Sequence, residues 1–246
     1  MKAVILAAGQ GTRIRSIHGE RPKCLIEEDG STILDYQLDA LALCGIHQVA
    51  IVVGYEKQQI VEHVRRRSWL KRQHVEFIVN PAYAITNNIY SLWLALEWVK
   101  DCDFIVLNAD VVLDGEILEK ALKATAPISM IVDPAWREET MKVVIADDRV
   151  LEMSKKITQE RFSATYIGIT LFNKGVWERF ADKMNDLVMN GRENEFFNSA
   201  VQELVHEGIH VGFTSTEGLP WAEIDDPTDL SFARQTVFPQ LSAATS

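Results

Sequence analysis

The chain has 246 residues, of which 47% are hydrophobic and 24% charged, and its formal net charge is −10. This is ordinary globular composition with enough apolar material for a sizeable core, which excludes disorder of the whole chain. The negative charge opposes a broad surface for nucleic acids or anionic membranes, because both need clustered positive charge. The basic run consists of Arg65–Arg67 with Lys71 and Arg72 and lies at the C-terminal end of a predicted helix. Solvated cations are favourable there, because this end of the helix dipole is negative.

The three cysteines, Cys24, Cys44 and Cys102, are an odd number without metal-ligand spacing, which predicts a reduced, cytoplasmic protein. The N-terminus enters a predicted strand within two residues and shows no pattern of a signal peptide. No apolar run approaches the ~20 residues needed to span a bilayer, so no membrane insertion is expected.

Short β-branched runs alternate with helical stretches along the chain. Most of these runs are apolar throughout, which predicts strands covered by helices on both faces. We therefore expect an α/β protein with a three-layer α/β/α, Rossmann-like, mostly parallel sheet. In chain order the predicted elements are strand Ala3–Leu6, helix Ile33–Cys44, strand Val49–Val53, helix Lys57–Arg67, strand Val75–Val79, helix Asn87–Val99, strand Phe104–Leu107, helix Glu116–Ala124, strand Ile128–Val132, and helices Lys174–Met189 and Glu195–Glu207.

From about residue 133 to 172 the helical spacing stops. Strands and turns are expected there, including Val143–Ile145 and Tyr166–Phe172, as a small, partly antiparallel insertion beside the main sheet. No repeat or linker divides the chain, so residues 1–241 are predicted to form a single domain and 242–246 a disordered tail.

The strongest motif is the run Leu6–Arg15, which reads LAAGQGTRIR and is followed by Pro22 and Lys23. A buried strand here runs directly into small residues and two glycines, so that a ligand can approach the main chain and its N–H groups can bind phosphates. The pattern is neither a Walker motif nor the dinucleotide fingerprint, whose third glycine is missing. A plain strand-to-helix turn is the alternative interpretation.

This motif resembles the first motif of the nucleotidyltransferases of the sugar-phosphate and phosphocholine type. The resemblance implies their fold, and it implies that Gly9, Gly11, Thr12 and Arg13 hold the nucleotide while Lys23 neutralises its phosphates. It also implies that the main chain near Leu6 and Ala8 contacts the base.

Two carboxylates are candidates for a Mg²⁺ site. Asp110 follows an apolar strand, at the end where open α/β sheets collect ligands. In the segment from Trp221 to Pro227, alternation directs Glu223 and Asp225 to one face. Two carboxylates with triphosphate oxygens suit octahedral Mg²⁺. The resemblance implies Asp110 and Asp225 as the metal ligands.

The implied reaction needs no covalent intermediate: an acceptor oxygen attacks the α-phosphorus in line, and pyrophosphate leaves. Arg13 and Lys23 are the first candidate cations. Lys142 and Lys155 are further candidates, and Lys155 is the looser match to a lysine of sugar-type relatives; ordinary surface charges are the alternative for both.

The run Asn87-Asn88-Ile89-Tyr90-Ser91-Leu92 resembles the phosphocholine cytidylyltransferase branch, which implies CTP as the donor. In a helix Asn87, Asn88 and Ser91 share a face and could reach the base or ribose, as could Asn80 before them. A capped core helix is the alternative.

A quaternary ammonium group is commonly bound by aromatic faces. Trp136, Trp221 and Tyr166 are therefore assigned with Glu223 and Lys142 to the acceptor site, which would take phosphocholine. The competing acceptors are 2-aminoethylphosphonate or similar amino-phosphoryl compounds and a sugar-1-phosphate.

Two other protein classes are alternatives. A regulatory nucleotide-binding subunit could lose the carboxylates or Lys23, which this chain carries, and a dehydrogenase would need the third glycine, which it lacks. A homo-oligomer is left open.

Overall fold

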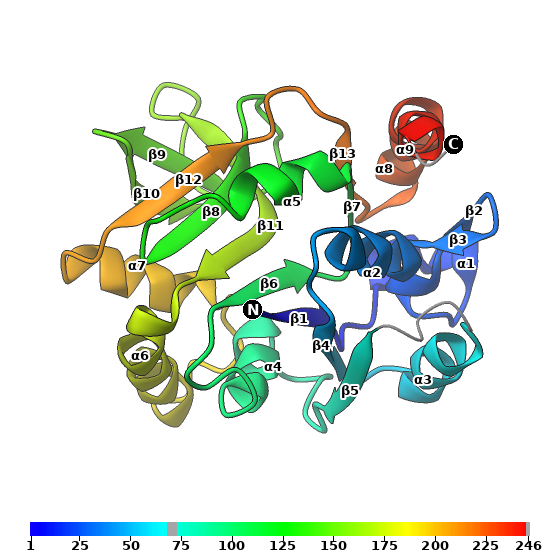
Figure 1. Cartoon of the computed structure of the whole chain (residues 1–246), viewed down its shortest axis with the longest axis horizontal. Coiled ribbons are helices and arrows are strands. Elements are labelled where there is room, and N and C mark those ends of the chain that lie inside the picture. The colour runs from blue at the N-terminus through cyan, green and yellow to red at the C-terminus, as the bar shows by residue number, and fades with distance from the viewer. Residues whose placement is uncertain (68–72, 245–246) are drawn as a thin grey trace.

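The computed structural model describes residues 1–67 and 73–244, in which nine strands form one mixed sheet with helices on both faces (Figure 1). The strands are β1 (Lys2–Ala7), β4 (Gln48–Val53), β5 (His74–Val79), β6 (Phe104–Asn108), β8 (Ile128–Asp133), β9 (Lys142–Ala146), β10 (Arg149–Ser154), β11 (Ala164–Phe172) and β12 (Val211–Ser215). Their order is β10-β9-β11-β6-β1-β4-β5, and β8 pairs with both β11 and β12.

The parallel half of the sheet is built around β1. Its Ile5 pairs with Ile51 of β4 and with Leu107 of β6, and all three side chains are fully buried. Burial on both faces explains why these strands are apolar throughout. β5 is the last strand on this side and pairs with β4, and its Val79 is 43% exposed.

The antiparallel half corrects one expectation. The region 133–172 was predicted as an insertion beside the sheet, but β11 lies inside it, antiparallel to β6 and to β8. All nine residues of β11 are buried, which is the pattern of an interior strand. At the edge of the sheet, β9 and β10 form an antiparallel hairpin.

Two short pairs stand apart from the large sheet: β2 (Glu27–Glu28) with β3 (Ser31–Thr32), and β7 (Val111–Leu113) with β13 (Trp221–Glu223). In the second pair Glu223 lies opposite Val111. This pairing places the segment that ends at Asp225 beside the segment that contains Asp110.

The helices are α1 (Arg15–His18), α2 (Ile33–Leu43), α3 (Lys57–Arg66), α4 (Asn88–Ala95), α5 (Gly115–Ala121), α6 (Trp177–Met189), α7 (Asn198–His206), α8 (Pro227–Phe232) and α9 (Phe238–Ala244). Short 3-10 turns cover Thr12–Ile14, Lys23–Leu25 and Lys174–Val176, and a π-helical turn covers Ala233–Val237. No helix in the described residues is both long and apolar enough to cross a bilayer.

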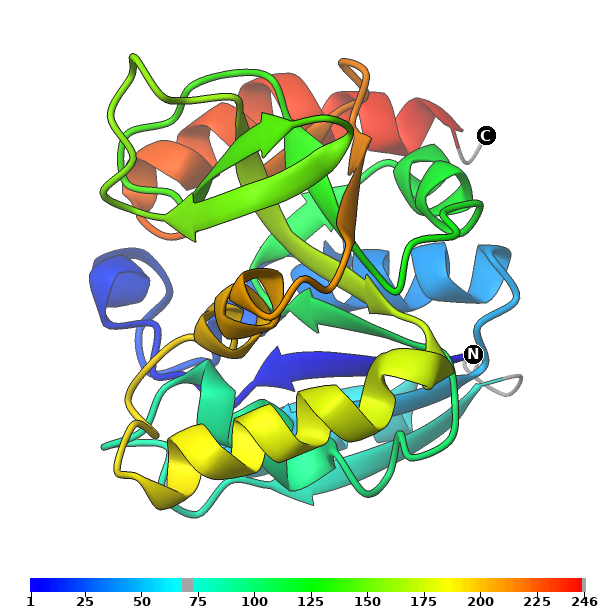
Figure 2. The same cartoon turned by 90° about the vertical axis from the view of Figure 1, so that its left-hand side faces the viewer.

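The helices divide into two layers around the sheet (Figures 1 and 2). α2, α3 and α5 pack on one face through residues such as Leu38, Ile60 and Ile117. α4, α6 and α7 pack on the other, and Figure 2 shows α6 running along that side. The C-terminal helices α8 and α9 form a third apolar cluster with β7 and β13, which includes Val112 and Phe238.

Most predicted elements are present, with shifted ends. α4 stops at Ala95 rather than Val99, and α7 begins at Asn198 rather than Glu195. α9 continues to Ala244, so the predicted tail begins inside a helix, and residues 245–246 lie outside the described part.

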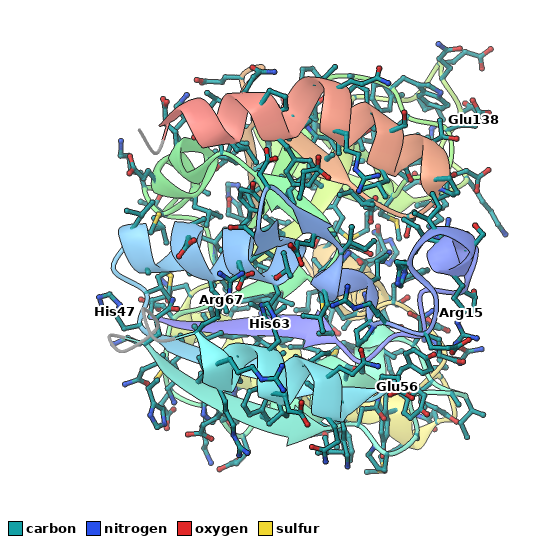
Figure 3. All side chains as sticks on the ribbon, turned by 90° about the vertical axis from the view of Figure 1, so that its right-hand side faces the viewer. Arg15, His47, Glu56, His63, Arg67 and Glu138 are labelled. Carbon is teal, nitrogen blue, oxygen red and sulfur yellow. The ribbon has the colours of Figure 1, made fainter. Side chains whose placement is uncertain are left out.

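The expected start of α2 is present, and it involves an unexpected ion pair. Thr32 and Asp35 form a capping box, with the Thr32 main-chain N–H 2.7 Å from Oδ2 of Asp35. The Asp35 side chain is fully buried and also binds Arg67 and His63, which lie between α3 and α2 in Figure 3. Arg67 was predicted to be solvated and instead joins two helices, while Lys71 and Arg72 lie outside the described residues.

Candidate active site

A cavity of about 320 Å³ opens at the carboxyl ends of β1, β5 and β6. Strand ends of this kind are where open α/β sheets bind ligands, because loops of neighbouring strands meet there. The residues that line it are Leu6, Ala7, Ala8, Gly9, Gly11, Thr12, Arg13, Pro22, Lys23, Cys24, Asn80, Tyr83, Thr86, Asn87, Asn88, Ser91, Asn108, Ala109, Asp110, Lys155, Phe196, Glu223 and Asp225.

The glycine loop forms one wall, and two of its contacts require glycine. Gly11 has φ +57°, and a Cβ there would lie 3.1 Å from the Cβ of Lys23. Gly54, at the end of β4, lets Tyr83 and the main chain of Ala8 approach, because a Cβ would lie 2.8 Å from the Ala8 oxygen. These two glycines are therefore needed for Lys23 and Tyr83 to pack against this wall.

Lys23 lies next to the glycine loop, between two carboxylates. Its Nζ donates to Oδ2 of Asp110 at 2.6 Å and to Oδ1 of Asp225 at 2.7 Å. The guanidinium of Arg13 contacts the other oxygen of Asp225 at 2.8 Å. The structure thus brings together four of the predicted catalytic residues, which come from three distant parts of the chain.

The electrostatics of this cluster follow from burial and mutual charge. Burial alone would lower the pKa of Lys23, but Asp110 and Asp225 raise it above its ordinary value. Burial alone would raise the pKa of Asp225, but Lys23 and Arg13 hold it below its ordinary value. Burial and the charges of Asp110 and Asp225 raise the pKa of Glu223 to about 8.

The donor set fits a hard divalent cation bound together with phosphates. Oδ1 of Asp110 is buried and has no hydrogen-bond partner among the described residues, and the Lys23 ammonium already occupies a cation position between Asp110 and Asp225. No group of three or more His, Cys, Asp or Glu in the described residues is arranged to hold a metal. Two carboxylates completed by phosphate oxygens are the usual Mg²⁺ arrangement in nucleotide sites.

The predicted nucleotide-binding residues all line the cavity, but several are bound to each other. The Asn80 side chain donates to Oγ of Ser91 at 3.0 Å, and both residues are at least 95% buried. Oδ1 of Asn88 accepts from the main-chain N–H of Phe197 at 2.9 Å. These contacts hold β5, α4 and the start of α7 together around the cavity.

The predicted acceptor residues separate into two groups. Glu223 and the predicted catalytic Lys155 line the cavity, whereas Trp136, Lys142, Tyr166 and Trp221 do not.

Trp221 is 4% exposed, its ring nitrogen donates to Asp133 at 2.8 Å, and the guanidinium of Arg137 lies 4.2 Å from its ring centroid. Tyr166 is 3% exposed and its hydroxyl lies 2.8 Å from Oγ1 of Thr170. The rings of Trp221 and Tyr166 are therefore both buried inside the fold.

Trp136 packs edge-on against Phe162, and the ammonium of Lys142 lies 4.7 Å from its ring centroid. Lys142 is 1% exposed and donates to the carbonyl oxygens of Glu138 and Thr140. The lysine that was predicted to meet the acceptor instead ties the loop after β8 to β9.

Phe196 was missed by the sequence prediction. It is 37% exposed, lines the cavity, and carries the Nζ of Lys155 at 5.2 Å from its ring centroid. The sequence placed it inside a helix from Glu195, where an aromatic is interpreted as packing; a helix start at Asn198 would have left it in a loop.

Residues 3–167 match the MobA-like NTP transferase domain, which is more than half of the chain. The chain belongs to this family of nucleotidyltransferases.

Three similar proteins cover almost the whole chain. A CTP:phosphoglutamine cytidylyltransferase of Campylobacter jejuni is 26% identical over 94% of this chain and 98% of its own length. A CMP-5'-(3-aminopropyl)phosphonate synthase of Streptomyces rubellomurinus is 28% identical over 93% of this chain, which spans 37% of that protein. The solved CTP:phosphocholine cytidylyltransferase of Streptococcus pneumoniae superposes with a TM-score of 0.76 at 25% identity, covering 95% of this chain and 97% of that one.

Proposed function

We propose that the protein is a Mg²⁺-dependent cytidylyltransferase, which transfers CMP from CTP to a small phosphorylated or phosphonate acceptor and releases pyrophosphate. The observation that carries the proposal is the Lys23 ammonium held between Asp110 and Asp225 at the mouth of the glycine loop. The choice of CTP is supported by the names of the three similar proteins, each of which refers to CTP or CMP.

The chain's own residues supply positioning and charge. The main chain of the glycine loop and the side chains of Arg13 and Lys23 would hold the phosphates of CTP. Mg²⁺ held by Asp110 and Asp225, when bound, would neutralise phosphate charge and make the α-phosphorus more electrophilic. Lys23, which donates to Asp110 and Asp225 in the protein without ligand, would then meet the charge that develops on the pyrophosphate.

The transfer takes place in one step and needs no covalent enzyme intermediate. An oxygen of the acceptor phosphate or phosphonate forms a bond to the α-phosphorus of CTP, and the bond from that phosphorus to the bridging oxygen of pyrophosphate breaks. An ionised acceptor oxygen needs no general base. Catalysis then depends on alignment and electrostatic stabilisation.

We place phosphocholine first among the acceptors. Phe196 supports this choice, because its ring already carries the Lys155 cation at the cavity wall and an aromatic face suits a quaternary ammonium. An acceptor with a primary amine is the second candidate. Glu223 favours it, because a carboxyl group at the cavity wall can hydrogen-bond an amine.

The test is a pyrophosphate-release screen of four NTPs against phosphocholine, 2-aminoethylphosphonate and glucose-1-phosphate. CTP with phosphocholine should react fastest, and chelation of Mg²⁺ should stop the reaction. Faster release from UTP or dTTP with glucose-1-phosphate would move the protein to the sugar-phosphate branch. No release with any pair would contradict the proposal.

A further inference from the structure

Gln37 is a polar residue in an apolar layer. It lies in the middle of α2, between the buried Leu34, Leu38 and Leu41, and its side chain is fully buried. Amide groups in such places need hydrogen-bond partners, because leaving them unpaired is costly.

The Gln37 amide binds two main-chain oxygens that flank Asp110. Its Nε2 donates to the carbonyl oxygen of Asn108 at 2.7 Å and to that of Val111 at 2.9 Å. Because both partners can only accept, the nitrogen end of the amide must face them. One side chain therefore bridges the turn that leads out of β6, passes through Asp110 and enters β7.

The same turn is held from its other side. The main-chain oxygen of Asp110 accepts from the N–H of Ile224 at 2.9 Å, in the segment that leads to Asp225. The Asp110 side chain then reaches Lys23. Gln37 thus binds the main chain of the turn, while the side chains of Asp110 and Asp225 both contact Lys23.

Fold stability alone does not explain an amide here. Oε1 of Gln37 is buried and has no hydrogen-bond partner in the part of the chain that the structure describes. The gain from two hydrogen bonds is thereby offset by one unpaired buried oxygen. What an apolar side chain of similar size could not supply is a fixed spacing between the Asn108 and Val111 carbonyls.

We propose that Gln37 is a positioning residue: its amide fixes the turn 108–111 so that the Asp110 carboxylate is presented to the cavity opposite Asp225. The effect of Gln37 on catalysis rests on the proposed nucleotidyl transfer. Its hold on the turn 108–111 is a property of the protein without ligand and does not depend on that function. Gln37 does not line the cavity, so its effect would be exerted through the turn.

The geometric part is tested by hydrogen–deuterium exchange of the protein without ligand. Gln37→Met keeps length and loses both donors. Leu41→Ala is the matched control, since Leu41 is a fully buried residue one helical turn further along α2. Relative to β1 and β4, exchange in 108–113 and 221–225 should rise about 10-fold in Gln37→Met and not in Leu41→Ala. Equal relative exchange in the two variants overturns the proposal.

The catalytic part is tested with the reaction that the screen identifies. Gln37→Met should lower kcat about 10- to 100-fold and raise the Mg²⁺ concentration for half-maximal rate several-fold, with KM for CTP changed less than 3-fold. Leu41→Ala should lower the melting temperature and leave kcat and the Mg²⁺ dependence alone. A Gln37→Met enzyme with wild-type kcat and Mg²⁺ dependence also overturns the proposal.

The two possible failures are distinguishable. If the unaltered protein transfers no CMP to any acceptor, the proposed function is wrong, and the exchange experiment still decides whether Gln37 holds the turn. If the unaltered protein is active and the exchange of 108–113 is unaffected by Gln37→Met, the proposed function stands and the role of Gln37 is wrong.

Discussion

Nζ of Lys23 lies 2.6 Å from Oδ2 of Asp110, although the two residues are 87 positions apart in the chain. The same nitrogen lies 2.7 Å from Oδ1 of Asp225, which is 202 positions from Lys23 in the chain. The Lys23 ammonium is partly buried, with 16% of its side chain exposed. Removing Lys23 would leave Asp110 without its ion-pair partner, whereas removing either aspartate would leave Lys23 paired with the other one.

Asp110→Asn and Asp225→Asn should each lower turnover at least ~100-fold with the fold intact, because each carboxylate would help to hold Mg²⁺. Steady-state kinetics across Mg²⁺ concentrations, with circular dichroism, makes the measurement. Asp148→Asn is the control, since Asp148 is an exposed turn residue between β9 and β10. Near-normal Mg²⁺-dependent rates in both variants would remove the metal assignment.

Lys23→Ala should reduce kcat/KM by about 30- to 1,000-fold, the equivalent of roughly 2–4 kcal/mol, if the ammonium meets charge that develops during transfer. Because Asp110 and Asp225 then lack their shared cation, Mg²⁺ should raise the melting temperature of Lys23→Ala more than that of the unaltered protein. A kinetically silent Lys23→Ala would mean that the loop binds something other than the reacting phosphates.

Phe196→Ala should raise the KM for phosphocholine by roughly 5- to 30-fold and leave the KM for CTP nearly unchanged, because a cation–π contact is worth about 1–2 kcal/mol. Phe196→Tyr should retain most of the affinity. An unchanged acceptor KM in Phe196→Ala would exclude this ring from the acceptor site.

Trp136→Ala is the control for Phe196→Ala. The sequence assigned Trp136 to the acceptor site, but the structure places it outside the cavity. Trp136 packs on Phe162 and Lys142 and does not line the cavity. Its loss should therefore lower the melting temperature and leave both KM values alone. A raised acceptor KM with an unchanged melting temperature would restore Trp136 to the acceptor site.

Asp39 predicts a pH dependence of stability. Burial and the neighbouring charge of Asp35 raise the pKa of Asp39 to about 6. The folded protein then keeps this proton at pH values where the unfolded chain has lost it, so the contribution of Asp39 to stability falls as pH rises from about 4 to 6. Above pH 6 the buried charge remains unfavourable.

Asp39→Asn should accordingly raise the free energy of unfolding at pH 8 by under about 1 kcal/mol, after allowance for solvent screening, and change it little at pH 4. Urea unfolding at the two pH values measures the difference. A larger effect at pH 4 than at pH 8 would contradict the assigned sign.

The sequence by itself determined the local features of this protein. Short β-branched runs predict strands, and the five strands so predicted lie within β1, β4, β5, β6 and β8. Most of these runs are apolar throughout and are largely buried, whereas the run in β5 contains Glu76 and lies at the edge of the sheet. The run from Gly9 to Arg13 and the position of Asp110 after a strand also predict a phosphate-binding edge without any tertiary information. These properties depend on neighbouring residues and on chain periodicity.

Only the tertiary structure decided which distant side chains meet and which faces are left open. The β7–β13 pairing brings Asp225 to Asp110 and Lys23, and β11 enters the sheet antiparallel to β6. Aromatic residues in polar surroundings do not reveal whether their ring reaches the cavity. A lysine cation lies near the rings of both Trp136 and Phe196, but of these two rings only that of Phe196 lines the cavity. The physical reason is that a polar sequence context reports local exposure, while access to a cavity is set by contacts between residues far apart in the chain.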